Sequence, residues 1–181
     1  MDASLLAQAV GIPVARAALW AAPLASAFLH GEISTNARKA AFLAQVGHES
    51  GGFHWTREIW GPTPAQSRYE GRADLGNTHP GDGSRYRGRG LIQITGRANY
   101  ARLCGRLAGM GCPDFVLHPE ALETPQWAAV SAADYWLDRN LNGLADAGAF
   151  RTLTKRINGG YNGLDDRLAR WDRAKRALRG T

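Results

Sequence analysis

The sequence predicts a mainly α-helical single domain that is interrupted near its middle by one long ordered loop. Segments with a helical spacing of apolar residues and with helix-capping residues fill most of the chain outside residues 61–90, which are rich in glycine and proline. A chain of 181 residues with 44% hydrophobic residues can bury one core. We therefore expect a single domain over residues 1–181, with a helical part over about 1–50, a loop and β part over about 51–96 and a second helical part over about 97–181.

Three helices are predicted in the N-terminal part, over residues 4–10, 13–30 and 37–49. Glycine follows the first and the second, and a helix C-terminus favours glycine. Thr35 or the asparagine after it is suited to cap the third helix, whose small and apolar residues indicate close packing on most sides. Because proline lacks a backbone donor, we expect a bend or break in the second helix near Pro23.

The central segment ends in a predicted β element. Leu91, Ile92 and Ile94 suit a short strand within residues 86–95, and a small hairpin is expected there. Helices resume after this segment and are predicted over residues 98–108, 119–139, 150–157 and 165–178. Pro125 either breaks the second of these helices in its first turns or marks a later start.

The charge balance favours an anionic partner. Lys and Arg number 22 and Asp and Glu number 16, and the net charge of +6 suits nucleic acid, an anionic membrane face or an acidic wall polymer. Cys104 and Cys112 are too few for a disulfide framework and lack metal-ligand spacing. We expect two reduced thiols, with one small-loop disulfide as the alternative, and no cofactor.

The sequence contains no uninterrupted apolar run of about 18 residues, so a transmembrane helix is not predicted. Residues 14–29 are rich in alanine and leucine and contain an Ala-Ser-Ala triplet that resembles a signal-peptidase site. Pro13, Pro23 and the acidic Asp2 are unlike a signal peptide, which has a basic start and an unbroken apolar stretch. Core helices are therefore the favoured interpretation of this segment.

The strongest chemical feature is a His-Glu-Ser-Gly-Gly segment over residues 48–52, with Glu58 following nine residues after Glu49. Glu49 ends a nearly apolar helix, where partial desolvation and the helix C-terminus both disfavour a charged carboxylate, as a general acid requires. Glu58 lies beyond the glycines and can fold back across a cleft. Two carboxyl groups on opposite walls are the minimum for hydrolysing a glycosidic bond. On residue types alone, a solvated helix-end residue and a surface ion pair with an arginine remain the favoured interpretations.

The spacing of the histidines and glycines disfavours two other chemistries. His48, Glu49 and His54 lie close together, but the histidines are six residues apart rather than the four of the helical HExxH zinc motif. No metal is therefore expected. The Gly-Arg-Gly of residues 88–90 does not complete the GxGxxG fingerprint, so a nucleotide site is rejected.

Polar side chains also gather in two later segments. Residues 86–100 alternate polar and apolar residues, so Gln93 and Thr95 would share one strand face and could hydrogen-bond a ligand or an attacking water. Asn158 begins an Asn-Gly-Gly turn, and its amide suits a sugar N-acetyl group because it both donates and accepts. The plainer alternatives are a structural hairpin for the first segment and a helix cap for the second.

The C-terminal end of the chain is basic. Its predicted helix carries arginines and a lysine opposite an apolar face that contains Leu168, Trp171, Ala174 and Leu178. Such a helix could contact an anionic membrane or wall. Packing through the apolar face, with solvated charges opposite, is the favoured interpretation.

Together these segments resemble glycoside hydrolase family 19, the chitinase-like group that includes many phage endolysins. Residues 48–52 resemble the family's His-Glu-Thr/Ser-x-Gly signature. Residues 86–100 resemble its Tyr-x-Gly-Arg-Gly-x-Ile-Gln-x-Ser/Thr signature with a trailing asparagine, and residues 158–160 its Asn-Gly-Gly turn. The resemblance covers the chain from about residue 36 to 165. It implies a lysozyme-like or chitinase-like fold, mainly α, with a long loop bordering the cleft.

The resemblance also implies an inverting mechanism on β-1,4-linked N-acetylglucosamine polymers. Glu49 matches the general acid, Glu58 matches the general base, and Thr95 matches a hydroxyl residue that helps the base to position the water. The residues that match substrate-binding positions are His48, Tyr86, Gln93, Asn99 and Asn158.

Two assignments stay open within the resemblance. Glu70 is an alternative base, because plant-type members with longer insertions carry the base later in the chain. The family also has an arginine after the Asn-Gly-Gly turn that tethers the catalytic carboxylates. Both Arg167 and Arg170 lie at a suitable position for this tether.

Chitin and peptidoglycan share the N-acetylglucosamine backbone, so the motifs do not separate them. The short chain, its positive charge and the lack of a convincing signal peptide or appended carbohydrate-binding module favour peptidoglycan. We expect a monomeric phage or prophage endolysin of a Gram-negative host, with no nucleic-acid partner. It would be made in the host cytoplasm and released to the cell wall by a holin. The alternatives are a secreted chitinase and a non-catalytic wall-binding protein.

Overall fold

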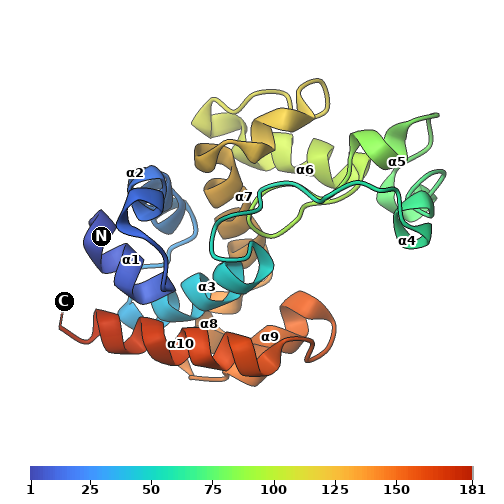
Figure 1. Ribbon diagram of the computed structural model, residues 1–181. Coiled ribbons are helices and arrows are strands. Elements are labelled where there is room, and N and C mark those ends of the chain that lie inside the picture. Colours follow the sequence, from blue (N-terminus) through green and yellow to red (C-terminus); the bar gives the residue numbers. More distant parts are fainter. Residues whose placement is uncertain (181) are drawn as a thin grey trace.

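The computed structural model describes residues 1–180 and confirms a mainly helical fold (Figure 1). The α-helices are α1 (Ala3–Val10), α2 (Val14–His30), α3 (Asn36–Glu49), α4 (Pro64–Ser67), α5 (Asp82–Arg85), α6 (Arg97–Leu107), α7 (Pro125–Asp138), α8 (Leu141–Asp146), α9 (Phe150–Asn158) and α10 (Leu164–Leu178). Short 3-10 helices lie among them, namely η1 (Ala73–Leu75), η2 (Ala108–Met110) and η3 (Pro119–Glu123).

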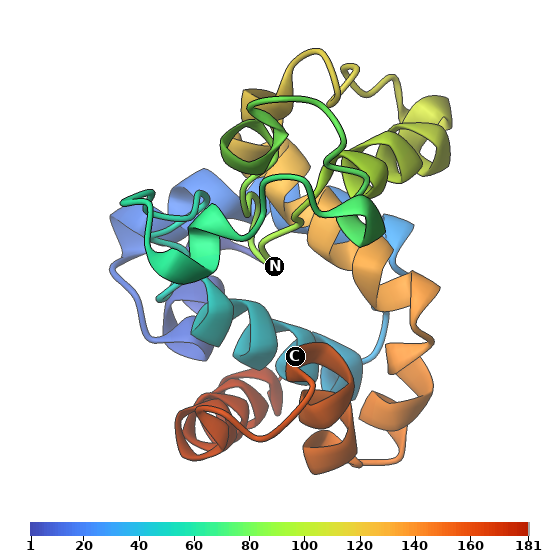
Figure 2. The same cartoon turned by 90° about the vertical axis from the view of Figure 1, so that its right-hand side faces the viewer.

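Helix α3 lies at the centre of the helical body and carries Glu49 as its last residue. Thr35 caps its start, where the Thr35 hydroxyl oxygen accepts a 3.2 Å hydrogen bond from the Arg38 N–H. Residues 40–47 are all buried, because small residues let the neighbouring helices approach closely. Helices α1 and α10 pack against α3, and α2 packs against α7. Figures 1 and 2 both place α4 and α5 away from α10, with α3 between them.

The predicted helices agree with the structure except in three respects. Helix α2 continues through Pro23, so the expected break is wrong. The proline deprives the Leu19 carbonyl of its helical partner, and the Leu19 side chain is 64% exposed, so water can replace that hydrogen bond. Residues 119–139 divide into η3 and α7, and Pro125 starts the second helix, which was one of the two expected outcomes. The short helices α4, α5 and α8 were not predicted, because four to six residues are too few to show a helical period.

The predicted strand over residues 86–95 does not form, and the expected hairpin is reduced to antiparallel bridges. Within residues 1–180 the only β pairing there consists of isolated bridges, Arg57 with Arg89 and Arg89 with Ile94. Gln93 adopts a left-handed φ of 56°, so Gln93 and Thr95 do not share a strand face. Contact with α7 overrides the strand propensity, since Leu91 is buried and its N–H donates to a carbonyl at the start of that helix.

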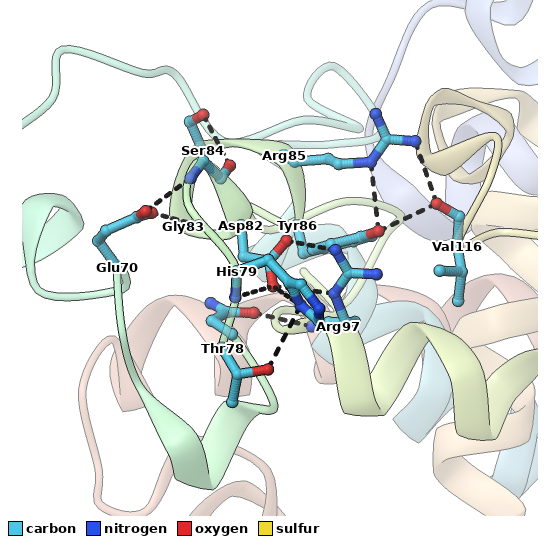
Figure 3. A network of polar contacts seen from close by, with 12 residues as sticks. Glu70, Thr78, His79, Asp82, Gly83, Ser84, Arg85, Tyr86, Arg97 and Val116 are labelled. Carbon is cyan, nitrogen blue, oxygen red and sulfur yellow. Dashed lines mark hydrogen bonds and ion pairs between the residues drawn. The ribbon is translucent and has the colours of Figure 1, made fainter.

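A buried ion pair fastens the central loop to α6 (Figure 3). The Asp82 carboxylate accepts hydrogen bonds from Arg97 at 2.6 and 2.8 Å, and Asp82 is 1% exposed. The Arg97 guanidinium also lies over the Tyr86 ring, 4.7 Å from its centroid. The Tyr86 hydroxyl donates in turn to the Val116 carbonyl at 3.1 Å. The long loop predicted from the glycine and proline content is therefore ordered by side-chain contacts.

Asp82→Asn is expected to destabilise the fold in a pH-dependent way. The hydrogen bonds from Arg97 hold the pKa of Asp82 at about 2, below the ordinary 3.8, despite the opposing effect of burial. This difference corresponds to about 2 kcal/mol of folding free energy at neutral pH. Stabilisation by a depressed pKa is complete above the ordinary pKa and is lost as the pH falls towards about 2. Urea denaturation of wild type and variant should show a gap at pH 7 that closes near pH 2, and a gap independent of pH would contradict this account.

Two further expectations concern the helices and the cysteines. Within residues 1–180 no single helix is long and apolar enough to cross a membrane, and α1 and α2 pass such a test only as a pair bent by 106°.

Cys104 and Cys112 are both free and partly buried, as in the favoured of the two predicted states. Burial raises the pKa of the Cys112 thiol.

Candidate active site

Glu49 is held by a buried arginine at the end of α3. The Arg167 guanidinium, whose side chain is 1% exposed, donates to Glu49 Oε1 at 2.7 Å, and the Glu49 side chain is 23% exposed. Glu49 is partly buried, as its place at the end of an apolar helix led us to expect, and an opposite charge also lies in direct contact with it. Among residues 1–180, the hydrogen bond from Arg167 engages Oε1 and leaves Oε2 of Glu49 without a protein donor.

Arg167, rather than Arg170, is the tether of this carboxylate. Arg170 lies three positions later on α10 and pairs with Asp166 at 2.7 Å. Arg167 is further fixed by donating to Gln45 Oε1 at 2.6 Å, and the Gln45 amide donates to Thr154 at 2.7 Å. This buried chain of hydrogen bonds locks α3, α9 and α10 together, so the position of Glu49 is set by three helices.

Glu58 lies in the extended segment after α3 and accepts hydrogen bonds from three neutral donors. Oε1 accepts from the Gln66 amide at 3.0 Å and from the Tyr69 hydroxyl at 3.4 Å. Oε2 accepts from the Gly88 N–H at 3.1 Å. Burial raises the pKa of Tyr69, and the adjacent charge of Glu58 raises it further.

Glu70, the alternative base, accepts hydrogen bonds from the backbone of the central loop. Its two oxygens accept from the backbone N–H groups of Gly81 at 2.6 Å and Gly83 at 2.8 Å, at the start of α5 (Figure 3). Both oxygens of Glu70 therefore have protein donors, and these hydrogen bonds help to order the loop. Glu58 and Glu70 therefore have different surroundings, although both lie in the same irregular segment.

A cavity of about 240 Å³ brings together three of the predicted residues, Gln93, Thr95 and Asn99. The Thr95 hydroxyl donates to the Gln93 carbonyl at 3.0 Å, and the Asn99 amide donates to the Thr95 carbonyl at 2.7 Å. The Thr95 hydroxyl oxygen consequently keeps its lone pairs for an external donor. These contacts arise in a turn rather than on the strand that the alternating pattern predicted.

Glu58 lines a second hollow of about 410 Å³, together with Trp55, Trp60 and Arg87. Gly88 lies close to one residue of each space. A β-carbon at Gly88 would lie 2.7 Å from Gln93 Oε1 and 3.3 Å from Glu58 Oε2, so a larger residue here would displace the end of the Gln93 side chain. Gln93 thus connects the cavity around Thr95 with the carboxylate of Glu58.

Tyr135 of α7 lines the first cavity and lies near Glu49. Its hydroxyl donates to the Ile157 carbonyl at 3.4 Å. Burial raises the pKa of Tyr135, and the negative charge of Glu49 raises it further. Tyr135 is therefore the cavity residue that senses the charge of Glu49.

The remaining predicted residues lie elsewhere or are engaged by the protein. Tyr86 is 1% exposed and orders the loop, so its expected contact with substrate is not available. The His48 ring contacts Asp166 at 2.6 Å and is 26% exposed. Asn158 ends α9, and its side-chain oxygen accepts from the Asn162 N–H at 3.3 Å.

Sequence reasoning missed Gln66, Tyr69 and Tyr135. Gln66 and Tyr69 lie in an irregular loop, where no periodic pattern indicates which side chains turn towards Glu58. Tyr135 lies on an apolar helix and carries no signal beyond its place on one face. Within residues 1–180 no group of three or more His, Cys, Asp or Glu side chains is arranged to hold a metal ion.

The C-terminal helix packs as expected through its apolar face. The Trp171 ring stacks on Phe150 with centroids 4.5 Å apart. Arg167 is the exception to the expected solvated charges, since it points into the core beneath Glu49.

Comparison with known proteins finds chitinases among the similar sequences and structures. No family model matches the chain. An Arabidopsis thaliana endochitinase is 34% identical over 122 residues, which cover 67% of this chain and 39% of that protein. Chitinase C from Streptomyces griseus superposes with a TM-score of 0.73 at 22% identity, covering 98% of this chain and 76% of the other. A structure described as a bacterial family 19 chitinase gives a TM-score of 0.67 at 20% identity, covering 87% and 85%. At these identities the two structures establish the chitinase-like fold and no more.

A Haemophilus influenzae protein described as a glycosyl hydrolase family 19 domain-containing protein establishes the family. It is 35% identical over 159 residues, which cover 72% of this chain and 74% of that protein. The fold agrees with this relationship. The chain belongs to glycoside hydrolase family 19.

Proposed function

We propose that this glycosidase hydrolyses the β-1,4-linked backbone of peptidoglycan by a single inverting displacement. The observation that carries the proposal is that the fold fixes two carboxylates in different ways: Glu49 is tethered by Arg167 through one oxygen, and Glu58 accepts three hydrogen bonds beside a hollow of about 410 Å³. Two fixed carboxyl groups are the minimum that glycoside hydrolysis needs.

Glu49 is the proposed general acid. Arg167 engages Oε1, so the proton delivered to the leaving glycosidic oxygen sits on Oε2. Arg167 then stabilises the carboxylate that forms as the proton leaves, because an opposite charge is already in contact. The rigid connection through Gln45 keeps Glu49 in position during this step.

Glu58 is the proposed general base. Its three donors hold the carboxylate in place, and a remaining lone pair accepts a proton from the attacking water. The Thr95 hydroxyl oxygen, whose own proton is engaged by Gln93, accepts from the same water and fixes its direction of attack. The amides of Gln93, Asn99 and Asn158 supply hydrogen bonds to N-acetyl groups.

The biological setting that we propose is lysis of a Gram-negative host by a phage or prophage endolysin. The net charge of +6 suits an anionic wall. In this setting the protein is made in the host cytoplasm and released by a holin. Hydrolysis of chitin is the second candidate, supported by relatives named endochitinase and chitinase C, and it goes with secretion.

Digestion of purified Gram-negative peptidoglycan and of chitin oligosaccharides tests the proposal. New saccharide reducing ends from peptidoglycan, identified by mass spectrometry, are expected. Rapid cleavage of chitin oligosaccharides without cleavage of peptidoglycan would establish the second candidate. Binding to cell walls without product from either glycan would indicate a non-catalytic wall-binding protein.

Tyr69→Phe is expected to slow hydrolysis and leave the fold intact. The change removes one hydrogen bond to Glu58 and keeps the aromatic ring beside Trp60. Loss of one weak hydrogen bond that positions the proposed base lowers kcat about fivefold. The measurement is kcat for both proteins, with thermal melting as the folding control. An unchanged kcat would separate Tyr69 from the role of Glu58.

A further inference from the structure

The cavity around Thr95 has an unequal distribution of charged side chains. Its wall carries three arginines and two aspartates, namely Arg102, Arg106, Arg139, Asp134 and Asp138. Arg106 is paired with both aspartates at 2.8 Å. Arg139 lies 3.5 Å from Asp138 and 3.6 Å above the centroid of the Tyr135 ring. The two aspartates are therefore already engaged by two of the three arginines.

Arg102 is the cation that remains. Within residues 1–180 it is exposed and has no carboxylate within ion-pair distance. It lies three residues after Asn99 and four before Arg106 on α6, so all three side chains occupy one face of that helix. This face borders the cavity that contains Thr95. A negatively charged group of a glycan bound in this cavity would contact Arg102, in the same cavity as Thr95.

We infer that Arg102 binds a carboxylate carried by the glycan substrate and so favours muramic residues over N-acetylglucosamine. This inference rests on the proposed function. A guanidinium pairs with a carboxylate through two parallel N–H donors, which gives both affinity and orientation. Chitin has no carboxylate to offer, whereas peptidoglycan carries one on the lactyl ether of each peptide-free muramic residue or on its stem peptide. Arg102 thus separates two polymers that share the same backbone linkage.

Arg102→Gln is the direct test, measured as kcat/KM on two substrates. Hydrolysis of peptidoglycan strands is expected to fall roughly tenfold or more, since a hydrogen-bonded ion pair is lost. Hydrolysis of chitin oligosaccharides should stay within about twofold of wild type, because the neutral glycan does not use this contact. Arg102→Lys keeps the charge and should restore part of the lost activity.

Arg176→Gln is the matched control, because it removes the same charge from an exposed position on α10. If the activity on peptidoglycan follows overall charge, both variants lose it equally and the inference is overturned. Three forms of the strand locate the carboxylate: with stem peptides, without them, and without them but with methyl-esterified lactyl groups. Sensitivity of Arg102→Gln to peptide-bearing strands alone assigns the stem peptide. Sensitivity on free lactyl groups that vanishes on esterification assigns the lactyl carboxylate.

The activities of wild type and Arg102→Gln distinguish a failure of the inference from a failure of the proposed function. Wild type that releases no saccharide from peptidoglycan contradicts the proposed substrate and the Arg102 inference together. Wild type that cleaves peptidoglycan, with Arg102→Gln retaining full activity on every strand form, contradicts the inference alone. Equal losses on peptidoglycan and chitin oligosaccharides would also overturn it, since they would make Arg102 a general contributor to the cavity.

Discussion

Glu49→Gln is expected to reduce glycan hydrolysis by roughly 10²–10⁴-fold while the protein remains folded. The glutamine carbonyl can still accept the hydrogen bond from Arg167, so the connection to α10 is retained. The amide cannot deliver a proton to the leaving oxygen, which is the proposed task of Glu49 Oε2. The release of reducing ends from peptidoglycan and from chitin oligosaccharides measures the effect.

Thermal melting monitored by circular dichroism controls for loss of structure in this variant. A melting temperature close to that of wild type together with a lost rate supports the assignment. A Glu49→Gln protein that stays folded and hydrolyses glycan at the wild-type rate would remove Glu49 from the mechanism.

Glu58→Gln is expected to cause a loss of similar size, roughly 10²–10⁴-fold, because an amide cannot accept a proton from water. Glu70→Gln is its matched control from the same loop. Glutamine offers one acceptor oxygen where Glu70 uses two, so this variant loses a hydrogen bond to Gly81 or Gly83 and its melting temperature falls. Its rate, measured well below that temperature, should stay near wild type. The reverse pattern would make Glu70 the base.

The helices could be predicted because their ends depend on local chemistry. Thr35 caps α3 through its own side chain, Gly11 ends α1 in a left-handed conformation, and Pro125 starts α7. Each signal acts within a few residues of the chain. The helix break predicted from Pro23 was wrong, because an exposed helix turn tolerates the missing hydrogen bond.

Long-range contacts determine the parts of the site that the sequence could not predict. Arg167 and Arg170 are both arginines on one helix, and only the packing of α10 on α3 decides which of them reaches Glu49. The strand pattern around Gln93 failed because the burial of Leu91 against α7 outweighs local preference. Gln93, Thr95 and Asn99 do line one cavity, and their roles towards substrate stay predictions. The roles proposed for Glu49 and Glu58 remain predictions for the variants above.

Proton nuclear magnetic resonance of the first products tests the inverting acid–base pair most directly. A β-1,4-linked glycan is digested while the anomeric signals of the new reducing ends are recorded before mutarotation. Because water attacks from the face opposite the leaving oxygen, the account predicts that the α-anomer appears first. Initial formation of the β-anomer would require a covalent intermediate or a substrate-assisted route, and would contradict the roles assigned to Glu49 and Glu58.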